Sequence, residues 1–308
     1  MATKPARRLL YALIAPLPLP LRRGIDRRVR GLAESRKLVR ADAVVVSHPK
    51  SGRTWLRALL SWYWRTARGL ATEALLGFDD YHRLDPTVPR ILFTHDNYPV
   101  DWLGPARLEA LYAARPLVLL TRDPRDVVVS AFFQTRRRTD PAKRRILGKD
   151  DPALADLSGF LRHPEWGLPR ILAFYERWAE RLPRLPRALR VRYEDLRRDP
   201  AGVFTRVLIH LGETPVDAGA VARAVAETEF SRMRERERRG ELATGRSRRF
   251  SAGGDDPAAL KVREGRIGGF RDHLRAGDIA WMEAEIARRM PPGFGYRAEE
   301  TDPSSGSG

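Results

Sequence analysis

The stretch 42–55, DAVVVSHPKSGRTW, decides the fold of this chain. Its first six residues are mostly small and β-branched, which is typical of a short buried strand. From Thr54 onward, TWLRALLSWYWRTARG repeats apolar residues at helical spacing instead. The stretch therefore predicts a strand, a tight turn over HPKSGR, and a helix.

The turn between these two elements has the composition of an anion-binding loop. A turn that leads into a helix directs free backbone N–H groups, and the positive end of the helix dipole, at one place. Gly52 lets the backbone approach closely, Lys50 adds a charge, and Ser51 and Thr54 add hydroxyl donors. The nucleoside-triphosphate loop instead has its lysine after the glycines, as G-x-x-x-x-G-K-[ST]. We expect a phosphate here, held by a P-loop-like turn that lacks the kinase lysine.

Three more apolar runs repeat this plan. They are PRILFTH at 89–95, RPLVLLT at 115–121, where a helix follows from about Pro124, and ALRVRYED at 188–195. Apolar strands that alternate with helices predict an α/β fold, in three α/β/α layers with a central parallel sheet. Ligands of such folds gather at the carboxyl ends of the strands.

The composition excludes some classes of site. The 308 residues include no cysteine, so there is neither a disulfide framework nor a cysteine-built metal site. The six histidines form no H-x-x-x-H pair, and we expect no metal ion. The lack of cysteine also favours a cytoplasmic location.

The chain is strongly basic, with a formal net charge of +18. Such a charge suits a nucleic acid, an anionic lipid or an anionic substrate, although an arginine-rich composition alone also produces it. The basic segments lack interleaved aromatic residues for base stacking, so we expect no nucleic-acid partner. Residues 1–40 carry eleven lysines and arginines against two acidic residues, which is half of the net charge.

We expect three parts: a basic and apolar N-terminal arm (1–40), one large domain (41–297) and a disordered tail (298–308). Within the arm, LLYALIAPLPLPL at 9–21 is too short to cross a bilayer and is interrupted by three prolines. An apolar stretch flanked by arginines suits the surface of an anionic membrane. Residues 7–30 are therefore expected either to touch a membrane peripherally or to pack on the domain itself.

Two charged, turn-rich segments, 135–165 and 231–262, depart from the alternation. Long irregular segments in a compact domain are usually lids or disordered. We expect mobile flaps near the site.

The phosphate loop leads to a family resemblance. KSGRTW resembles the 5′-phosphosulfate loop, close to P-K-S-G-T-T-W, of sulfotransferases that use 3′-phosphoadenosine 5′-phosphosulfate (PAPS). TRDPRDVVVS at 121–130 is similar to the family's 3′-phosphate motif, in which Arg122 and Ser130 would be the ligands. REGRIGGF at 263–270 resembles the closing R-K-G-x-x-G-D-W, which assigns Arg263 and Gly265 to the same phosphate.

Two further motifs occur in the family's order. YED at 193–195 looks like the family's Y-E-D segment, which implies that Tyr193 lies beside the nucleotide. ETEF at 227–230 stands where the family has T-S-F, which implies that Thr228 and Phe230 flank the adenine together with Trp55. In the loop, the resemblance implies nucleotide contacts from Lys50, Ser51, Gly52, Arg53, Thr54 and Trp55.

The resemblance also implies catalytic roles. ILFTHDNYP is similar to the family's K-T-H-x-x-P, and His95 has the position of its general base. An imidazole with a pKa of about 6.5 is largely neutral at pH 7, as a base must be. Lys50 would stabilise the leaving phosphate, and no divalent metal is required because a sulfonate carries less charge than a phosphoryl group.

The sequence departs from the family at three places. Phe93 replaces the lysine two positions before the catalytic histidine, and we hypothesise that Arg53 supplies the missing charge. Glu264 replaces the lysine of R-K-G, and we expect its carboxylate to point away from the phosphate. The family's dimer motif, K-x-x-x-T-V-x-x-x-E, is missing from RDHLRAGDIAWMEAEI, which leaves the oligomeric state open.

These motifs predict a sulfotransferase that moves the sulfuryl group of PAPS to a hydroxyl or amine and releases adenosine 3′,5′-bisphosphate (PAP). The acceptor is a small molecule, a sugar or a lipid of unknown identity. The alternative is a Mg²⁺-dependent nucleotide kinase or hydrolase on a related fold, which would need a Walker lysine and a metal-holding aspartate.

Overall fold

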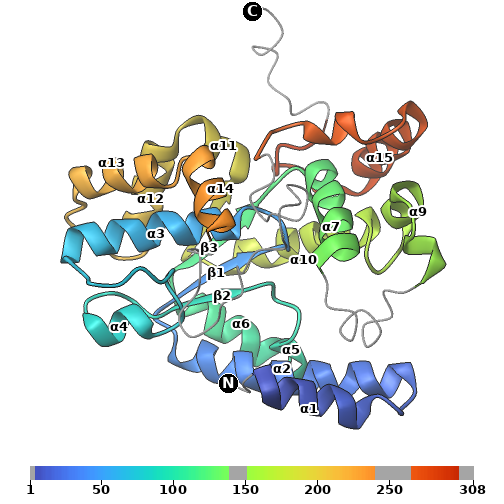
Figure 1. Ribbon diagram of the computed structural model, residues 1–308, viewed down its shortest axis with the longest axis horizontal. Coiled ribbons are helices and arrows are strands. Elements are labelled where there is room, and N and C mark those ends of the chain that lie inside the picture. The colour runs from blue at the N-terminus through green and yellow to red at the C-terminus, as the bar shows by residue number, and fades with distance from the viewer. Residues whose placement is uncertain (1–3, 139–150, 240–264, 298–308) are drawn as a thin grey trace, which may run out of the picture.

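The computed structural model describes residues 4–138, 151–239 and 265–297 (Figure 1). Its centre is a sheet of four parallel strands in the order β2-β1-β3-β4. The strands are β1 (Ala43–Ser47), β2 (Ile91–Thr94), β3 (Leu117–Thr121) and β4 (Ala188–Arg192). All four lie within the runs that the sequence predicts as strands, and the parallel sheet is confirmed.

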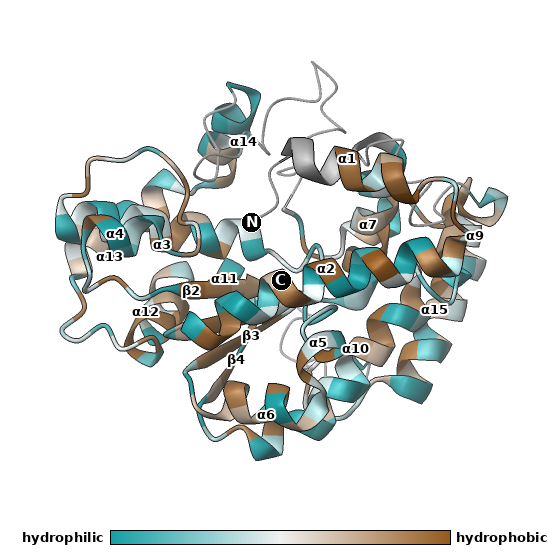
Figure 2. Cartoon of the chain, turned by 90° about the horizontal axis from the view of Figure 1, so that it is seen from below, coloured by the Kyte–Doolittle hydropathy of each residue, from teal (hydrophilic) through white to brown (hydrophobic). Residues whose placement is uncertain are grey.

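The two central strands, β1 and β3, are apolar up to their last residue because both faces of the sheet are covered, whereas the edge strand β4 carries Arg190 and Arg192. Val44 and Val46 of β1 belong to one core cluster, and Ala43 and Val45 belong to the other. Successive side chains of a strand point to opposite faces, so a run without polar residues serves both clusters. Figure 2 shows the brown of apolar residues along β2 and β3.

Helices form a layer on each side of this sheet (Figure 1), which confirms the three-layer α/β/α prediction. One face is covered by α3 (Arg53–Arg68), α12 (Pro200–His210) and α13 (Ala218–Glu227). The other face is covered by α6 (Pro105–Ala113), α7 (Pro124–Arg138), α10 (Leu168–Arg181) and α15 (Ala276–Arg289).

Shorter elements connect these layers. They are α4 (Asp80–Leu84), α5 (Val100–Leu103), η1 (Pro152–Leu154), α9 (Leu157–Arg162), η2 (Leu182–Arg184), α11 (Tyr193–Arg198), α14 (Phe230–Arg238) and η4 (Gly269–Asp272).

The prediction that 135–165 and 231–262 are irregular is wrong where these segments are helical. The helix α7 continues to Arg138, α9 follows further along, and α14 covers the start of the second segment. The sequence of α14 is too highly charged to show an apolar helical pattern. The helix nevertheless buries Met233 and is supported by an ion pair between Arg239 and Glu235 at 2.9 Å. Residues 139–150 and 240–262 lie outside the described chain, as does the tail 298–308.

The N-terminal arm forms α1 (Lys4–Ile14) and α2 (Leu19–Arg40). The second helix packs on β2 and α5, and its Leu38 is fully buried in the core cluster shared with the sheet. Gly31 lies so close to the 97–102 segment that an added Cβ would be 2.7 Å from the carbonyl oxygen of Tyr98. This end of the arm is therefore part of the domain's packing. None of the described helices is both long and apolar enough to cross a membrane.

The strand order also determines where the loops meet. From β1 the chain moves to β2 on one side, and β3 then pairs with β1 on the other. The loops that follow β1 and β3 are therefore neighbours at the carboxyl edge of the sheet, which is the topological switch point where such folds bind ligands.

Candidate active site

The loop after β1 has the geometry of an anion cradle. Lys50 has a φ of 75°, and Gly52, with a φ of 91°, is the N-cap of α3. Ser51 is fully buried, and its Oγ has no hydrogen-bond partner within the described residues. A buried hydroxyl without a partner costs about 1–3 kcal/mol. An anion bound at this helix N-terminus would supply the missing partner, so these residues fit a phosphate.

Gly52 is required at its position by Tyr193, the first residue of α11. A Cβ at residue 52 would be 2.4 Å from Cδ2 of the Tyr193 ring. The Tyr193 hydroxyl donates to the carbonyl oxygen of Gly265 at 3.1 Å, and a Cβ at Gly265 would be 2.7 Å from the ring of Phe230. The close packing brings together four residues that the sequence assigns to the nucleotide site.

Arg122 joins the loop to the segment that begins at Gly265. Its Nη1 donates to the carbonyl oxygen of Lys50 at 3.2 Å, and its Nη2 donates to that of Arg266 at 3.3 Å. The guanidinium lies over the Tyr193 ring, with Cζ 4.5 Å from the centroid. Its Nε is buried and has no hydrogen-bond partner in the part of the chain described. Arg122 thus combines a fixed orientation with donor capacity for an anion.

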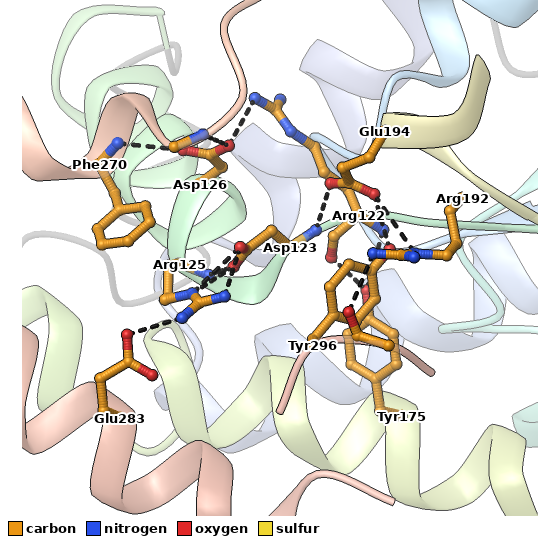
Figure 3. A network of polar contacts seen from close by, with 12 residues as sticks. Arg122, Asp123, Arg125, Asp126, Tyr175, Arg192, Glu194, Phe270, Glu283 and Tyr296 are labelled. Carbon is orange, nitrogen blue, oxygen red and sulfur yellow. Dashed lines mark hydrogen bonds and ion pairs between the residues drawn. The ribbon is translucent and has the colours of Figure 1, made fainter. Parts of the chain in front are cut away.

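A polar network behind Arg122 fixes this geometry (Figure 3). Asp126 on α7 accepts hydrogen bonds from the backbone N–H groups of Gly268 at 3.0 Å and Phe270 at 3.1 Å, and its carboxylate lies 3.6 Å from Arg122 Nη2. The Tyr175 hydroxyl accepts from the backbone N–H of Arg122 and donates to its carbonyl oxygen. The sequence motif did not reveal these roles of Asp126 and Tyr175, because they depend on contacts between distant segments.

Trp55 connects the first turn of α3 to the end of α13. Its indole N–H donates to Thr228, with the carbonyl oxygen at 3.1 Å and Oγ1 at 3.3 Å. Its ring also meets the edge of Tyr193, with centroids 5.8 Å apart. Trp55 thus contacts both Tyr193 and Thr228, and Phe230 lies with Tyr193 beside Gly265, although Thr228 and Phe230 follow Trp55 by more than 170 residues.

His95 lies at the carboxyl end of β2, beside the end of β1. Its Nδ1 is 2.8 Å from the carbonyl oxygen of Ser47. A carbonyl oxygen only accepts, so Nδ1 carries the proton and Nε2 keeps its lone pair. Burial, and then the positive charge of Arg53, hold the pKa of His95 well below its usual range. His95 is therefore a neutral imidazole at pH 7, with Nε2 able to accept a proton.

Two charged residues near His95 were not predicted. The Arg57 guanidinium lies over the Phe93 ring at 4.2 Å, and it also lowers the pKa of His95. Arg57 follows Arg53 by one helical turn, and that spacing was a usable signal for a shared face. Glu34 of α2 accepts from Thr94 Oγ1 at 2.9 Å, and burial raises the pKa of its carboxyl. No local pattern marks Glu34, because packing of the arm brings it here.

Some predicted site residues are not joined to this group. Ser130 lies partly exposed on α7, and the hydrogen bonds of the Arg122 guanidinium within the described residues go to Lys50 and Arg266. Arg263 and Glu264 lie outside the described residues. Lys50, Arg53 and Thr54 lie on the loop and the first turn of α3, as predicted. Across 4–138, 151–239 and 265–297, no cluster of three or more histidine or acidic side chains is arranged to hold a metal ion.

The comparisons with known proteins agree with this geometry. The model of the sulfotransferase domain family matches residues 40–290. In a comparison with curated proteins, none matches the chain. Among solved structures, mouse sulfotransferase SULT7A1 complexed with PAP is similar, with a TM-score of 0.56 and 17% identity over 83% of this chain and 86% of that one.

Two structures of a retinol dehydratase are also similar. The complex with retinol and PAP has a TM-score of 0.54 and 21% identity, and it covers 82% of this chain and 81% of the other. The complex with androsterone and the inactive cofactor PAP has a TM-score of 0.56 and 20% identity, with the same coverage. At these identities the likeness establishes the fold, and the family match carries the assignment. The chain therefore belongs to the sulfotransferase family, and it is a PAPS-dependent sulfotransferase.

Proposed function

We propose that this enzyme transfers the sulfuryl group of PAPS to a hydroxyl or amine of a small-molecule, sugar or lipid acceptor, with His95 as the general base. The observation that carries the proposal is the position of Arg122. Its guanidinium contacts the Lys50 carbonyl, the Arg266 carbonyl and the Tyr193 ring at once. One cation therefore joins the anion-binding loop, the segment after Gly265 and the aromatic group.

The chain's own residues divide the nucleotide between two ends. Lys50, Ser51 and the N–H groups at the start of α3 would hold the 5′-phosphosulfate. Arg122, with Ser130, Arg263 and Gly265, would hold the 3′-phosphate, and Trp55, Thr228 and Phe230 would flank the adenine. When bound, PAPS supplies the sulfuryl group and the leaving phosphate. Support comes from the buried Ser51 hydroxyl and Arg122 Nε, which lack partners within the described chain and can both donate to an anion.

Proton removal is the task of His95. The Ser47 carbonyl fixes the proton on Nδ1, which leaves Nε2 as the atom that takes the proton of the acceptor hydroxyl or amine. The low pKa keeps nearly all of the imidazole in the neutral, competent form at pH 7. A base of this kind typically contributes about 10²- to 10⁴-fold to the rate.

Positive charge near His95 would stabilise the negative charge that develops during transfer. We propose Arg53 and Arg57 for this role, in addition to Lys50. Both arginines lower the pKa of His95, which indicates that their charge is felt at the imidazole. Arg57 lies 4.2 Å from the ring centroid of Phe93, the position where the family has lysine. Helix α3 would thus supply the charge that β2 lacks.

The test replaces His95 by glutamine, which keeps a polar side chain but is no base. We expect kcat/KM to fall by about 10²- to 10⁴-fold, while the affinity for PAP changes less than twofold. The matched control is His82→Gln on α4, since His82 also pairs its Nδ1 with a backbone carbonyl oxygen, that of Val88, at 2.9 Å. Loss of activity in both variants, or in neither, would refute the assignment of the base.

The nucleotide site needs a separate test. In Arg122→Gln we expect affinity for PAP to fall by at least about tenfold, because a hydrogen bond to a charged group contributes about 1.5–3 kcal/mol. Affinity for ADP, which lacks the 3′-phosphate, should change little. Equal losses for PAP and ADP would show that Arg122 does not read the 3′-phosphate. The acceptor is then sought by screening extracts with labelled PAPS.

A further inference from the structure

The hairpin of α1 and α2 presents an apolar face that the rest of the described chain leaves exposed. On α1, Tyr11 and Ile14 are buried in a small cluster with Leu17 of the connecting turn and Ile25 of α2. Leu9 and Leu13, one helical turn apart, lie on the outside with exposed fractions of 62% and 67%. Large apolar side chains that form one exposed patch usually mark a surface that binds a partner or a membrane.

The outward face of α2 continues this surface and adds positive charge. Leu21, Val29 and Val39 are 56%, 41% and 48% exposed. The same helix also exposes Arg28, Arg36 and Arg40. Figure 1 places α1 and α2 together along the lower edge of the molecule, and Figure 2, which views the molecule from that side, shows apolar and hydrophilic bands along α2 and brown along the coloured part of α1.

The acidic residues of this helix point away from that surface. Asp26 is buried and pairs with Arg30 at 2.7 Å. Glu34 accepts its hydrogen bond from Thr94 on the opposite side, next to the site. The hairpin surface, defined here as Leu9, Leu13, Leu21, Arg28, Val29, Arg36, Val39 and Arg40, is therefore apolar and cationic. A carboxylate reaches its edge at Asp79, which lies 3.8 Å from Arg40 Nη2.

We propose that the hairpin surface docks on an anionic lipid bilayer. A helix that carries apolar and basic residues on one face lies in the interface plane, with its apolar side chains among the acyl chains and its cations at the headgroups. The 22 residues of α2 give a contact about 33 Å long. A second copy of the chain fits less well, because pairing two such faces would bring like charges together. An anionic bilayer satisfies both the apolar and the cationic part.

The experiment is flotation of the full chain with vesicles at physiological salt. Neutral phosphatidylcholine vesicles are compared with vesicles that contain 30% phosphatidylglycerol. We expect binding to the anionic vesicles, with a partition coefficient at least about tenfold above that for neutral ones. The variant Leu9→Ser/Leu13→Ser should lose about tenfold or more per leucine, and Arg28→Gln/Arg36→Gln should lose about fivefold per arginine.

The matched control is Leu84→Ser/Ile209→Ser, because these residues are 57% and 56% exposed outside the hairpin. Its partition coefficient should equal that of the unmodified chain, and all variants should bind PAP unchanged, which shows that they are folded. No binding to anionic vesicles, or unchanged binding of the leucine variant, overturns the proposal. A monomer–dimer shift in the leucine variant without vesicles also overturns it, because the surface would then contact a second copy.

Discussion

Replacing Gly52 by alanine tests whether the loop and the Tyr193 ring must approach as closely as the structure has them. The new Cβ would be 2.4 Å from Cδ2 of Tyr193, so the ring must move. The ring is not free to do so, because its hydroxyl bonds Gly265 at 3.1 Å and its face is covered by Arg122 at 4.5 Å.

The expected loss has two parts. A left-handed backbone at an L-residue costs about 1–2 kcal/mol, and Gly52 has a φ of 91°. Loss of the Tyr193–Gly265 hydrogen bond adds about 1 kcal/mol. We therefore expect the free energy of unfolding to fall by about 2–3 kcal/mol. Because Arg122 rests on the displaced ring, the Kd for PAP should also rise, by about 10- to 100-fold.

Urea unfolding and calorimetric titration with PAP measure the two effects. The matched control is Gly69→Ala, at the C-cap of α3, where φ is 61° but no atom lies within 4 Å of the added Cβ. That variant should lose only the backbone part of the stability and bind PAP normally. If Gly52→Ala behaves like Gly69→Ala in both measurements, the close approach is not needed and the reasoning is wrong.

Three further predictions concern pH and the network around Arg122. Because the pKa of His95 is lowered, the imidazole stays neutral as the pH falls, and the acid limb of the kcat/KM profile should lie below pH 6.5. An inflection at or above pH 6.5 would contradict this. In Asp126→Asn the side chain can accept only one of the two hydrogen bonds that the N–H groups of Gly268 and Phe270 donate to the carboxylate. Titration should show PAP affinity weakened by about tenfold. Unchanged affinity would mean that the 265–270 segment does not contribute to binding. In Tyr175→Phe the backbone N–H of Arg122 loses its partner, and urea unfolding should show a loss of about 1–3 kcal/mol; a loss below 0.5 kcal/mol would mean that another group replaces the hydroxyl.

The sequence was sufficient for those parts of the fold that depend on local patterns. Apolar runs gave the four strands, and the change from a β-branched run to helical spacing placed the turn at Lys50 and Gly52. The order of the family motifs also identified residues that lie near Tyr193. Each of the motifs around Trp55, Phe230 and Gly265 contains one residue that packs close to this ring. The roles of Ser130 and Arg263 stay predictions.

Contacts between segments that are distant in the chain could not be predicted from the sequence. Glu34 belongs to a stretch that looked like a separate basic arm, yet it bonds Thr94, the neighbour of His95. The helix α14 was hidden because its sequence, FSRMRERER, is dominated by charge, and its stability depends on buried Met233 and on ion pairs. In both cases a contact with a distant segment completes the structure: Glu34 bonds Thr94, and Met233 packs with Ala58 and Leu75. Such contacts cannot be read from the spacing of apolar residues.

The orientation of His95, which we propose as the base, depends on an oxygen of the main chain. Many catalytic imidazoles are held by a carboxylate, which a single substitution removes. Here the acceptor is the carbonyl of residue 47, which every amino acid provides equally. A substitution at residue 47 would change the packing of its side chain but would leave the His95 proton on Nδ1. The tautomer therefore depends on the backbone geometry of β1 and not on the identity of any one side chain.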